Sequence, residues 1–322
     1  MNFSIGFDKR DMPKVHEAFD KIVASNKWTE SYYTELFESK WSEYNSLDSV
    51  AFSSWSGAAV SAMEFFDLKG KTVLCPSNTF MATPLSVLNA GAEVQFVDCN
   101  KTDLCMSFED MKAKAEKYKP AAVWVVHIGG HIAFDIDKIA DYCRLNGIIL
   151  LEDCAHSAGA EWNGKKTGQW GDAGFYSFYA TKTITTGEGG MLVSKNKELI
   201  EYARKYRNYG KFDYKIRGLN FRITEFAAAI GAIQTDRLKD IIDFKNNYAG
   251  QLDSQYQNRV LLPEGMISGY YKYIVFDPIE KSTGKVYDEQ CHRILNHSVE
   301  LPNSDWVAGN HWCVPIYYNP EI

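Results

Sequence analysis

Two residues in separate segments have the surroundings that carbonyl chemistry requires. Lys182 lies in a segment rich in apolar residues, threonine and glycine, between Ser177 and Gly190. Partial desolvation there would lower the pKa of its amine and free it to attack a carbonyl carbon. Asp153 follows the apolar residues 148–151, where a buried carboxylate needs a cationic partner such as a protonated pyridine nitrogen. Each also has an ordinary interpretation, Lys182 as a surface lysine and Asp153 as a helix N-cap.

Neighbouring residues suggest how a ligand would be held. His156, three residues after Asp153, could hydrogen-bond a ring oxygen of a ligand or could be a core histidine. The turn 53–59 contains Ser56, Gly57 and Ala58 and precedes an expected helix. Small residues at a helix start let an anion approach the unpaired N–H groups, so this turn indicates a phosphate site.

Two other groupings do not match a known kind of site. Residues 159–166 approach a nucleotide P-loop but lack Ser or Thr after the lysine. Cys291, His292 and His297 fit no common zinc spacing. We expect no metal site.

Composition and charge narrow the function classes. The chain has 322 residues, 45% of them apolar and 24% charged, which is typical of a globular protein. Its formal charge of −6 disfavours nucleic acid as a partner. It has no apolar run long enough to span a membrane, residues 1–10 lack the apolar core expected of a signal peptide, and its seven cysteines show no paired spacing. We therefore expect a cytoplasmic protein with reduced thiols.

Apolar runs alternate with helix-length segments, the rhythm of a parallel α/β sheet. The expected strands are residues 72–75, 94–98, 121–126, 148–152, 174–178 and 190–193, and the expected helices are residues 56–68, 84–90, 107–117, 136–145 and 222–248. We place an N-terminal segment and a large domain in residues 1–235 and a small C-terminal domain in residues 236–322. Tyr270, Tyr271 and Tyr273 in the latter could contact substrate or be ordinary packing.

The candidate residues follow the carboxyl ends of two expected strands. Asp153 and His156 come after residues 148–152, while Ser177 and Lys182 come at the end of residues 174–178 or soon after. Ligands of open α/β sheets bind outside these ends, so both pairs could face one pocket.

Eight segments in order resemble the DegT/DnrJ/EryC1/StrS family of sugar aminotransferases, which have fold type I and depend on pyridoxal 5'-phosphate (PLP). They are residues 56–59, 76–83, 127–130, 152–159, 171–174, 177–182, 187–190 and 218–222. The resemblance runs from about Trp28 to Thr235. It implies a large domain with a mostly parallel central sheet flanked by helices, and a smaller C-terminal α/β domain that is short for the family.

The resemblance also implies roles for the candidate residues toward PLP. Lys182 would bind the cofactor aldehyde covalently and later move a proton between the substrate α-carbon and the cofactor. Asp153 would keep the pyridine nitrogen protonated. His156 would contact the O3′ side of the ring, and Phe80 would stack on it.

For the phosphate, the resemblance implies a cradle shared between two chains. It consists of the amides of Gly57 and Ala58, the Ser177 hydroxyl, and the Asn220 side chain of a second subunit. Many relatives have threonine where this chain has Ala58, and Ser56 could compensate for the missing hydroxyl. A contribution from Asn220 across subunits would require a homodimer.

The implied reaction transfers an amino group from glutamate or glutamine to a nucleotide-linked keto sugar in amino-sugar, polysaccharide or glycan biosynthesis. Three alternatives stay open. The acceptor could be a keto-inositol, or the enzyme could dehydrate a keto sugar, although that family branch has histidine in place of the lysine at position 182. The chain could also be a noncatalytic PLP-binding regulatory protein, as Ala58 and the short carboxyl region would allow.

Overall fold

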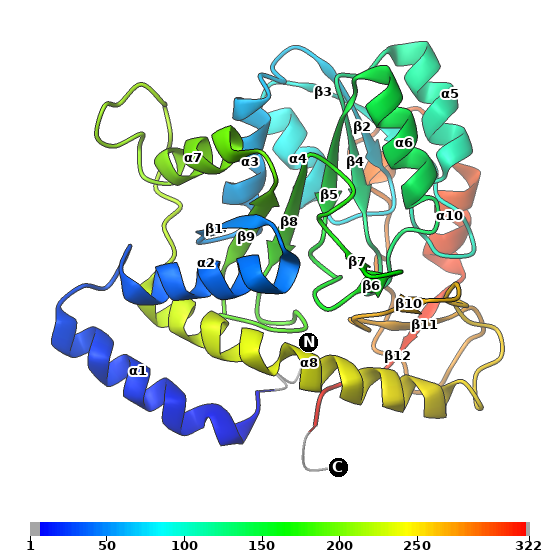
Figure 1. The fold of residues 1–322 in the computed structure, drawn as a ribbon. Helices are drawn as coiled ribbons and strands as arrows, with labels where there is room; N and C mark the ends of the chain where they lie inside the picture. Colours follow the sequence, from blue (N-terminus) through cyan, green and yellow to red (C-terminus); the bar gives the residue numbers. More distant parts are fainter. Residues whose placement is uncertain (1–6, 320–322) are drawn as a thin grey trace.

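The computed structural model describes residues 7–319 and is built around a seven-stranded sheet (Figure 1). The strands are β1 (Asp48–Phe52), β2 (Thr72–Pro76), β3 (Glu93–Val97), β4 (Ala122–Val126), β5 (Ile149–Asp153), β8 (Ala173–Ser177) and β9 (Gly190–Ser194). Their order is β1-β9-β8-β5-β4-β2-β3, and only β9 pairs antiparallel to its neighbours. The expected mostly parallel sheet is confirmed, whereas β1 was not among the expected strands.

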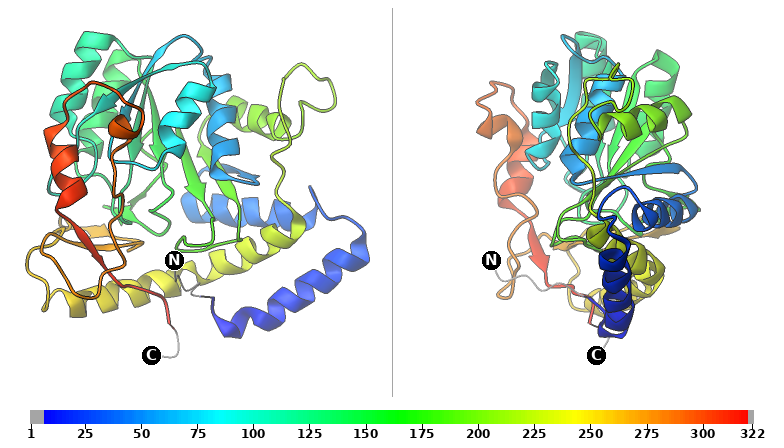
Figure 2. Two further views of the ribbon diagram at one scale, coloured as in Figure 1. Left: turned by 180° about the vertical axis from the view of Figure 1, so that it is seen from behind. Right: turned by 90° about the vertical axis from the view of Figure 1, so that its left-hand side faces the viewer.

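Helices cover both faces of the sheet (Figure 2). One face carries α3 (Trp55–Phe65), α4 (Ala82–Asn89) and α7 (Lys197–Tyr206), and the other carries α5 (Phe108–Tyr118), α6 (Ile136–Asn146), α2 (Tyr32–Asn45) and α8 (Glu225–Leu252). Successive strand residues enter opposite cores: Phe52 and Leu192 pack on the α3 side, and Ala51 and Met191 on the α2 side. The five expected helices are confirmed within a few residues at each end.

The long helix α8 is joined to α2 at its first residue. The Thr224 side chain caps α8 by accepting from the Ala227 amide at 3.2 Å. The buried Glu225 carboxylate accepts from the amides of Tyr33 and Thr34 at 2.7 and 3.0 Å, which satisfies unpaired N–H groups at the start of α2. The helix is continuous through residue 235, where the domain boundary was placed, and ends at Leu252.

The chain after α8 returns to the carboxyl edge of the large sheet. Its elements are β10 (Met266–Ile267), β11 (Tyr273–Val275), α9 (Cys291–Ile294), α10 (Pro302–Gly309) and β12 (Trp312–Val314). Strands β11 and β12 form an antiparallel pair, while β10 extends a small sheet with β6 (Glu161–Trp162) and β7 (Lys165–Lys166). None of the helices within residues 7–319 is both long and apolar enough to cross a membrane.

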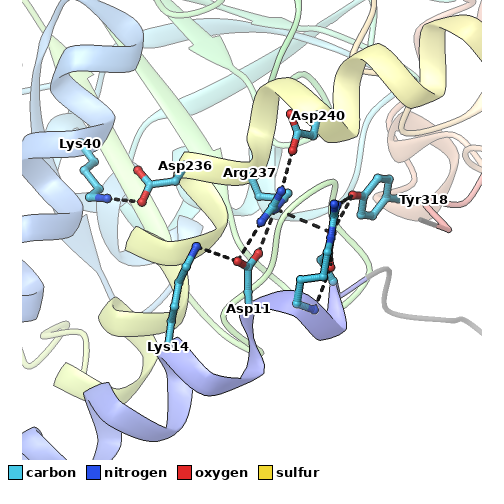
Figure 3. Close-up of polar contacts among 9 residues, drawn as sticks. Asp11, Lys14, Lys40, Asp236, Arg237, Asp240 and Tyr318 are labelled. Atoms are coloured by element: carbon cyan, nitrogen blue, oxygen red, sulfur yellow. Dashed lines mark hydrogen bonds and ion pairs between the residues drawn. The ribbon is translucent and has the colours of Figure 1, made fainter. Parts of the chain in front are cut away.

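Charged groups tie α8 to the amino end of the chain (Figure 3). Arg237 on α8 makes two hydrogen bonds of 2.9 Å to the buried Asp11 carboxylate, just before α1 (Met12–Ser25). The Tyr318 hydroxyl donates to Asp8 at 2.9 Å, so the end of the described chain joins the same network. The hydrogen bonds from Arg237 hold the pKa of Asp11 below its usual value.

We predict that Arg237→Ala lowers the free energy of unfolding by about 2 kcal/mol near neutral pH, because it leaves a buried carboxylate short of donors. The folded pKa of Asp11 lies below its unfolded value, so its contribution is present above about pH 4 and is lost as the pH falls. Urea unfolding at several pH values would measure this. The control Lys239→Ala breaks an exposed ion pair with Asp243 and should change the free energy of unfolding far less than Arg237→Ala does. A difference between wild type and Arg237→Ala that stays constant as the pH is lowered through the acid range would contradict the prediction.

Candidate active site

The carboxyl ends of β5 and β8 bring the candidate residues to one edge of the sheet. Asp153 is the last residue of β5 and Ser177 the last of β8, and these strands are neighbours. Lys182 and His156 follow them, and both contact the ring of Tyr271. The structure therefore places Lys182, Asp153 and His156 in one site, at the edge where open α/β sheets bind ligands.

The Asp153 carboxylate is buried and accepts two hydrogen bonds. One oxygen accepts from the Thr83 hydroxyl at 2.9 Å and the other from the Ala155 amide at 3.0 Å. Burial raises the pKa of Asp153, and these hydrogen bonds and the positive charge of Lys182 oppose that rise. Within residues 7–319 no cation lies within ion-pair distance of it. A protonated ring nitrogen is the kind of group that this carboxylate would stabilise.

Lys182 is partly buried beneath an aromatic ring. Its Nζ lies 4.8 Å from the centroid of the Tyr271 ring, a cation–π geometry. Its pKa is lowered to about 8, chiefly by burial; the charge of Asp153 opposes this shift, and the charge of Lys272 adds to it. The amine is therefore available in its neutral, nucleophilic form near physiological pH.

His156 is stacked between two tyrosines from the carboxyl region. Its ring centroid is 4.2 Å from that of Tyr271 and 5.9 Å from that of Tyr287, with interplanar angles of 28° and 19°. Burial and the nearby positive charges of Lys182 and Lys272 hold its pKa well below the usual value, so the ring is neutral. Its Nδ1 is buried without a hydrogen-bond partner among the described residues. An unpaired buried nitrogen of this kind marks a position where a ligand could bond.

The residues predicted to bind phosphate within one chain lie around the start of α3. Ser177 pairs with Gly190, and a Cβ on Gly190 would lie 2.5 Å from the backbone of Ser54, so glycine is needed for this close approach. The Gly57 amide donates to the Ser54 hydroxyl at 3.1 Å, and the buried Ala58 follows it in the first turn. An anion bound at this turn and the Ser54 hydroxyl would both accept from the Gly57 N–H. The exposed Ser56 lies in the same turn.

Two further candidates are exposed. The Phe80 side chain is 64% exposed, and its backbone lies next to the Tyr287 hydroxyl, which connects it to the aromatic stack on His156. Asn220 is exposed and accepts from the Arg222 amide at 3.3 Å. Its neighbour Phe221 packs on Gly57 of the same chain.

Glu152 lies beside the site and is saturated with hydrogen bonds. It accepts from His127 Nε2 at 3.0 Å and from the amides of Gly168, Trp170 and Gly171 at 2.8, 2.7 and 2.6 Å. The ligand atoms of His127, Glu152 and Cys154 lie within 4.8 Å of one another, a possible metal grouping. Because these donors already occupy the carboxylate, the grouping acts as a structural hydrogen-bond centre.

The histidine and cysteine of α9 also have structural partners. His292 Nδ1 lies 2.6 Å from the Ser77 hydroxyl, and the Cys291 amide donates to the Ser77 carbonyl at 3.0 Å. Both side chains are fully buried. They attach the carboxyl region to the loop after β2.

The described residues fit PLP chemically. Asp153 is a buried carboxylate without a cation, His156 offers an unpaired ring nitrogen, Lys182 has a lowered pKa, and the glycine-dependent turn lies beside Ser177. Thr83, Tyr287 and Lys272 had no assigned role from the sequence. Thr83 lies in a segment that resembles the family, whereas nothing in the local sequence around Tyr287 or Lys272 marks them as site residues.

The overall fold is that of fold-type I PLP-dependent transferases. The crystal structure of an aminotransferase, TlmJ from Streptoalloteichus hindustanus, superimposes with a TM-score of 0.89 at 25% identity, covering 98% of this chain and 94% of that one. A model of the DegT/DnrJ/EryC1/StrS aminotransferase family matches residues 10–267, and the chain belongs to this family.

Two named relatives match over two thirds or more of this chain. A GDP-perosamine synthase of Vibrio cholerae is 35% identical over 224 residues, 67% of this chain and 60% of that protein. A UDP-4-amino-4,6-dideoxy-N-acetyl-β-L-altrosamine transaminase of Campylobacter jejuni is 29% identical over 276 residues, 82% of this chain and 72% of that protein. The chain thus spans about 60% of the length of the first of these relatives.

We predict that Lys182 titrates near pH 8. At pH 7 about one amine in ten would be neutral, against about one in 3,000 for an unperturbed lysine. The initial rate at which the PLP-free protein acquires the absorbance of lysine-bound PLP should rise with pH to a plateau, with a midpoint near 8. Lys182→Arg, which has no amine of this reactivity, is the control. A midpoint above 10 would contradict the prediction.

Proposed function

We propose that this chain is a PLP-dependent aminotransferase that transfers an amino group from glutamate or glutamine to a nucleotide-linked keto sugar. The observation that carries the proposal is that Lys182, whose pKa is lowered, lies in the same site as the buried carboxylate Asp153, which forms no ion pair with any residue in 7–319. Perturbed ionisable groups at the carboxyl edge of an α/β sheet are typical of an active site. The named functions of the GDP- and UDP-sugar relatives support a nucleotide sugar as acceptor.

Each residue would have a distinct task. When bound, PLP supplies an electron sink for the substrate carbanion. The Lys182 amine would hold the cofactor and then carry the proton to and from the substrate carbon. Asp153, fixed by Thr83 and Ala155, would accept a hydrogen bond from the protonated ring nitrogen. His156 Nδ1 would hydrogen-bond the cofactor on its O3′ side. The Phe80 ring would stack on the cofactor ring.

The lysine argues against the dehydratase alternative, since that branch of the family has histidine at this position. A keto-inositol acceptor stays open, because a keto-inositol and a keto sugar would present the same ketone carbon to Lys182. The seven cysteines are all free and buried, which supports a reducing compartment such as the cytoplasm. The complete set of perturbed groups favours turnover over a purely regulatory role.

The proposed homodimer rests on the exposure of Asn220 and of nearby aromatic side chains. Phe212 and Tyr214 are 88% and 64% exposed in the same segment between α7 and α8. Exposed aromatic side chains that gather in one segment are typical of a protein interface. We propose that this segment contacts a second copy of the chain and that Asn220 binds the phosphate in the partner's site.

Lys182→Ala should abolish both the lysine-bound absorbance and amino transfer, because it removes the amine that would bind the cofactor covalently and carry the proton. The measurement is the visible spectrum with PLP before and after glutamate or glutamine is added. In wild type, bleaching by one of the two identifies the donor. Lys281→Ala, at an exposed lysine of the carboxyl region, is the control. Normal turnover by Lys182→Ala would disprove the assignment, and ammonia with a deoxy sugar as the products would favour dehydration.

Co-expression of Lys182→Ala chains with Asn220→Ala chains tests the shared site. If Asn220 acts across subunits, each mixed dimer has one intact site and should show about half of the wild-type activity at limiting PLP, because hydrogen bonds to a charged group contribute about 1.5 to 3 kcal/mol. If Asn220 acts within its own chain, the mixed dimers should be no more active at limiting PLP than dimers of Asn220→Ala chains alone. Tags on the two chains would allow the mixed dimers to be purified.

A further inference from the structure

The carboxyl region brings a second lysine to the aromatic ring that covers Lys182. The Lys272 Nζ lies 5.3 Å from the centroid of the Tyr271 ring, and the Lys182 Nζ lies 4.8 Å from the same centroid. The Tyr271 hydroxyl is 3.1 Å from the Thr181 hydroxyl, which fixes the ring beside the Lys182 loop. Two ammonium groups therefore share one ring at the candidate active site.

Backbone contacts determine the position of Lys272. Its amide donates to the Gly129 carbonyl at 2.8 Å, so the residue is held against the loop that follows β4. The next glycine, Gly130, has a φ of +108°, and a Cβ there would lie 2.5 Å from the backbone nitrogens of Tyr270 and Tyr271. Only glycine permits this approach without rearrangement. Lys272 is thus placed at the carboxyl edge of the sheet, on the same side as Asp153.

A third lysine, Lys245, holds the segment that carries Lys272. Lys245 on α8 is 5% exposed, and its Nζ donates to the Tyr270 carbonyl at 3.0 Å. Burial lowers its pKa to about 8, and the charge of Lys272 contributes to that shift. Lys245 positions Tyr270 and keeps a second positive charge close to Lys272.

The positive charges of these three lysines are not balanced by ion pairs with carboxylates of the described residues. Within residues 7–319 none of Lys182, Lys245 and Lys272 has an ion-pair partner within 4 Å. The carboxylate that acts on Lys182 is Asp153, which already accepts from Thr83 and Ala155. Partly buried cations without counter-ions are unfavourable, and an anionic ligand would remove that cost.

We propose that Lys272 binds an anionic group of the substrate next to Lys182. The inference rests on the proposed function, in which both substrates carry such groups: the amino donor has carboxylates, and the nucleotide-linked sugar has a diphosphate. Carboxylate and phosphate oxygens share the chemistry that an ammonium group recognises. Tyr271 and Lys245 are positioning residues, because they hold the segment that carries Lys272.

Binding of two probes to the PLP-free protein tests this site by calorimetry. Glutarate represents the donor carboxylates, and pyrophosphate represents the diphosphate of the acceptor. Lys272→Gln removes the charge at nearly constant length, Lys272→Arg restores it, and Lys281→Gln is the control at an exposed lysine. We expect Lys272→Gln to weaken one probe by about 10- to 100-fold, with Lys272→Arg close to wild type and the control unchanged.

The probe that is affected identifies the source of the anion. Loss of glutarate binding alone assigns Lys272 to the amino donor, and loss of pyrophosphate binding alone assigns it to the nucleotide. With PLP present, the same variant should raise the KM of the corresponding half-reaction while its rate at saturation changes less than about 3-fold. Probe binding by Lys272→Gln within about 3-fold of wild type for both probes would overturn the inference, as would the absence of binding by the wild type.

A measurement on the wild-type protein does not depend on how the variants fold. The bound probe should protect Lys272, but not Lys281, from acetylation measured by mass spectrometry. Equal acetylation of Lys272 with and without probe would overturn the inference. Failure of the proposed function is distinguishable, because it would appear as wild-type protein that acquires no lysine-bound PLP absorbance, whatever the outcome with the two probes.

Discussion

The hydrogen bonds of the Glu152 carboxylate hold the strand ends at the active-site edge of the sheet in place. This carboxylate lies at full burial immediately before Asp153 and joins His127, which follows β4, to three backbone amides of the loop that leads into β8. A buried carboxylate is stable only when hydrogen bonds replace its hydration, and here four donors do so. The ends of β4, β5 and β8 are therefore fixed relative to one another. Because Asp153 follows Glu152 directly in β5, the same hydrogen bonds fix its position.

The carboxyl region completes the site by covering it. Tyr271 and Tyr287 stack on His156, and Tyr271 also lies over the Lys182 amine. Covering these groups removes water, which lowers the pKa of Lys182 and of His156 and raises that of Asp153. The same packing that excludes solvent thus prepares the lysine as a nucleophile and the histidine as a neutral hydrogen-bonding partner.

Several features of the large domain follow from local sequence patterns. The apolar runs at β2, β4 and β5 are short and lie between helix-length segments, so their strand character and parallel arrangement could be predicted. Lys182 and Asp153 were recognisable because each lies just after such a run. In contrast, the sequence does not show that the Ser54 hydroxyl accepts a hydrogen bond from the Gly57 amide, or that Glu225 caps the start of α2. Each contact depends on how close the side chain and the backbone come in the folded protein.

The sequence by itself determined the alternating α/β rhythm and the local neighbourhoods of Lys182, Asp153 and His156. Hydrophobic periodicity and turn residues act over a few positions, so this information is local. Only the tertiary structure brought Tyr271, Lys272 and Tyr287 to those residues. Backbone contacts between the Gly129 loop and the segment before β11 place Tyr271 and Lys272, and stacking on His156 places Tyr287. Side chains that meet in this way carry no local pattern, and their roles follow from packing.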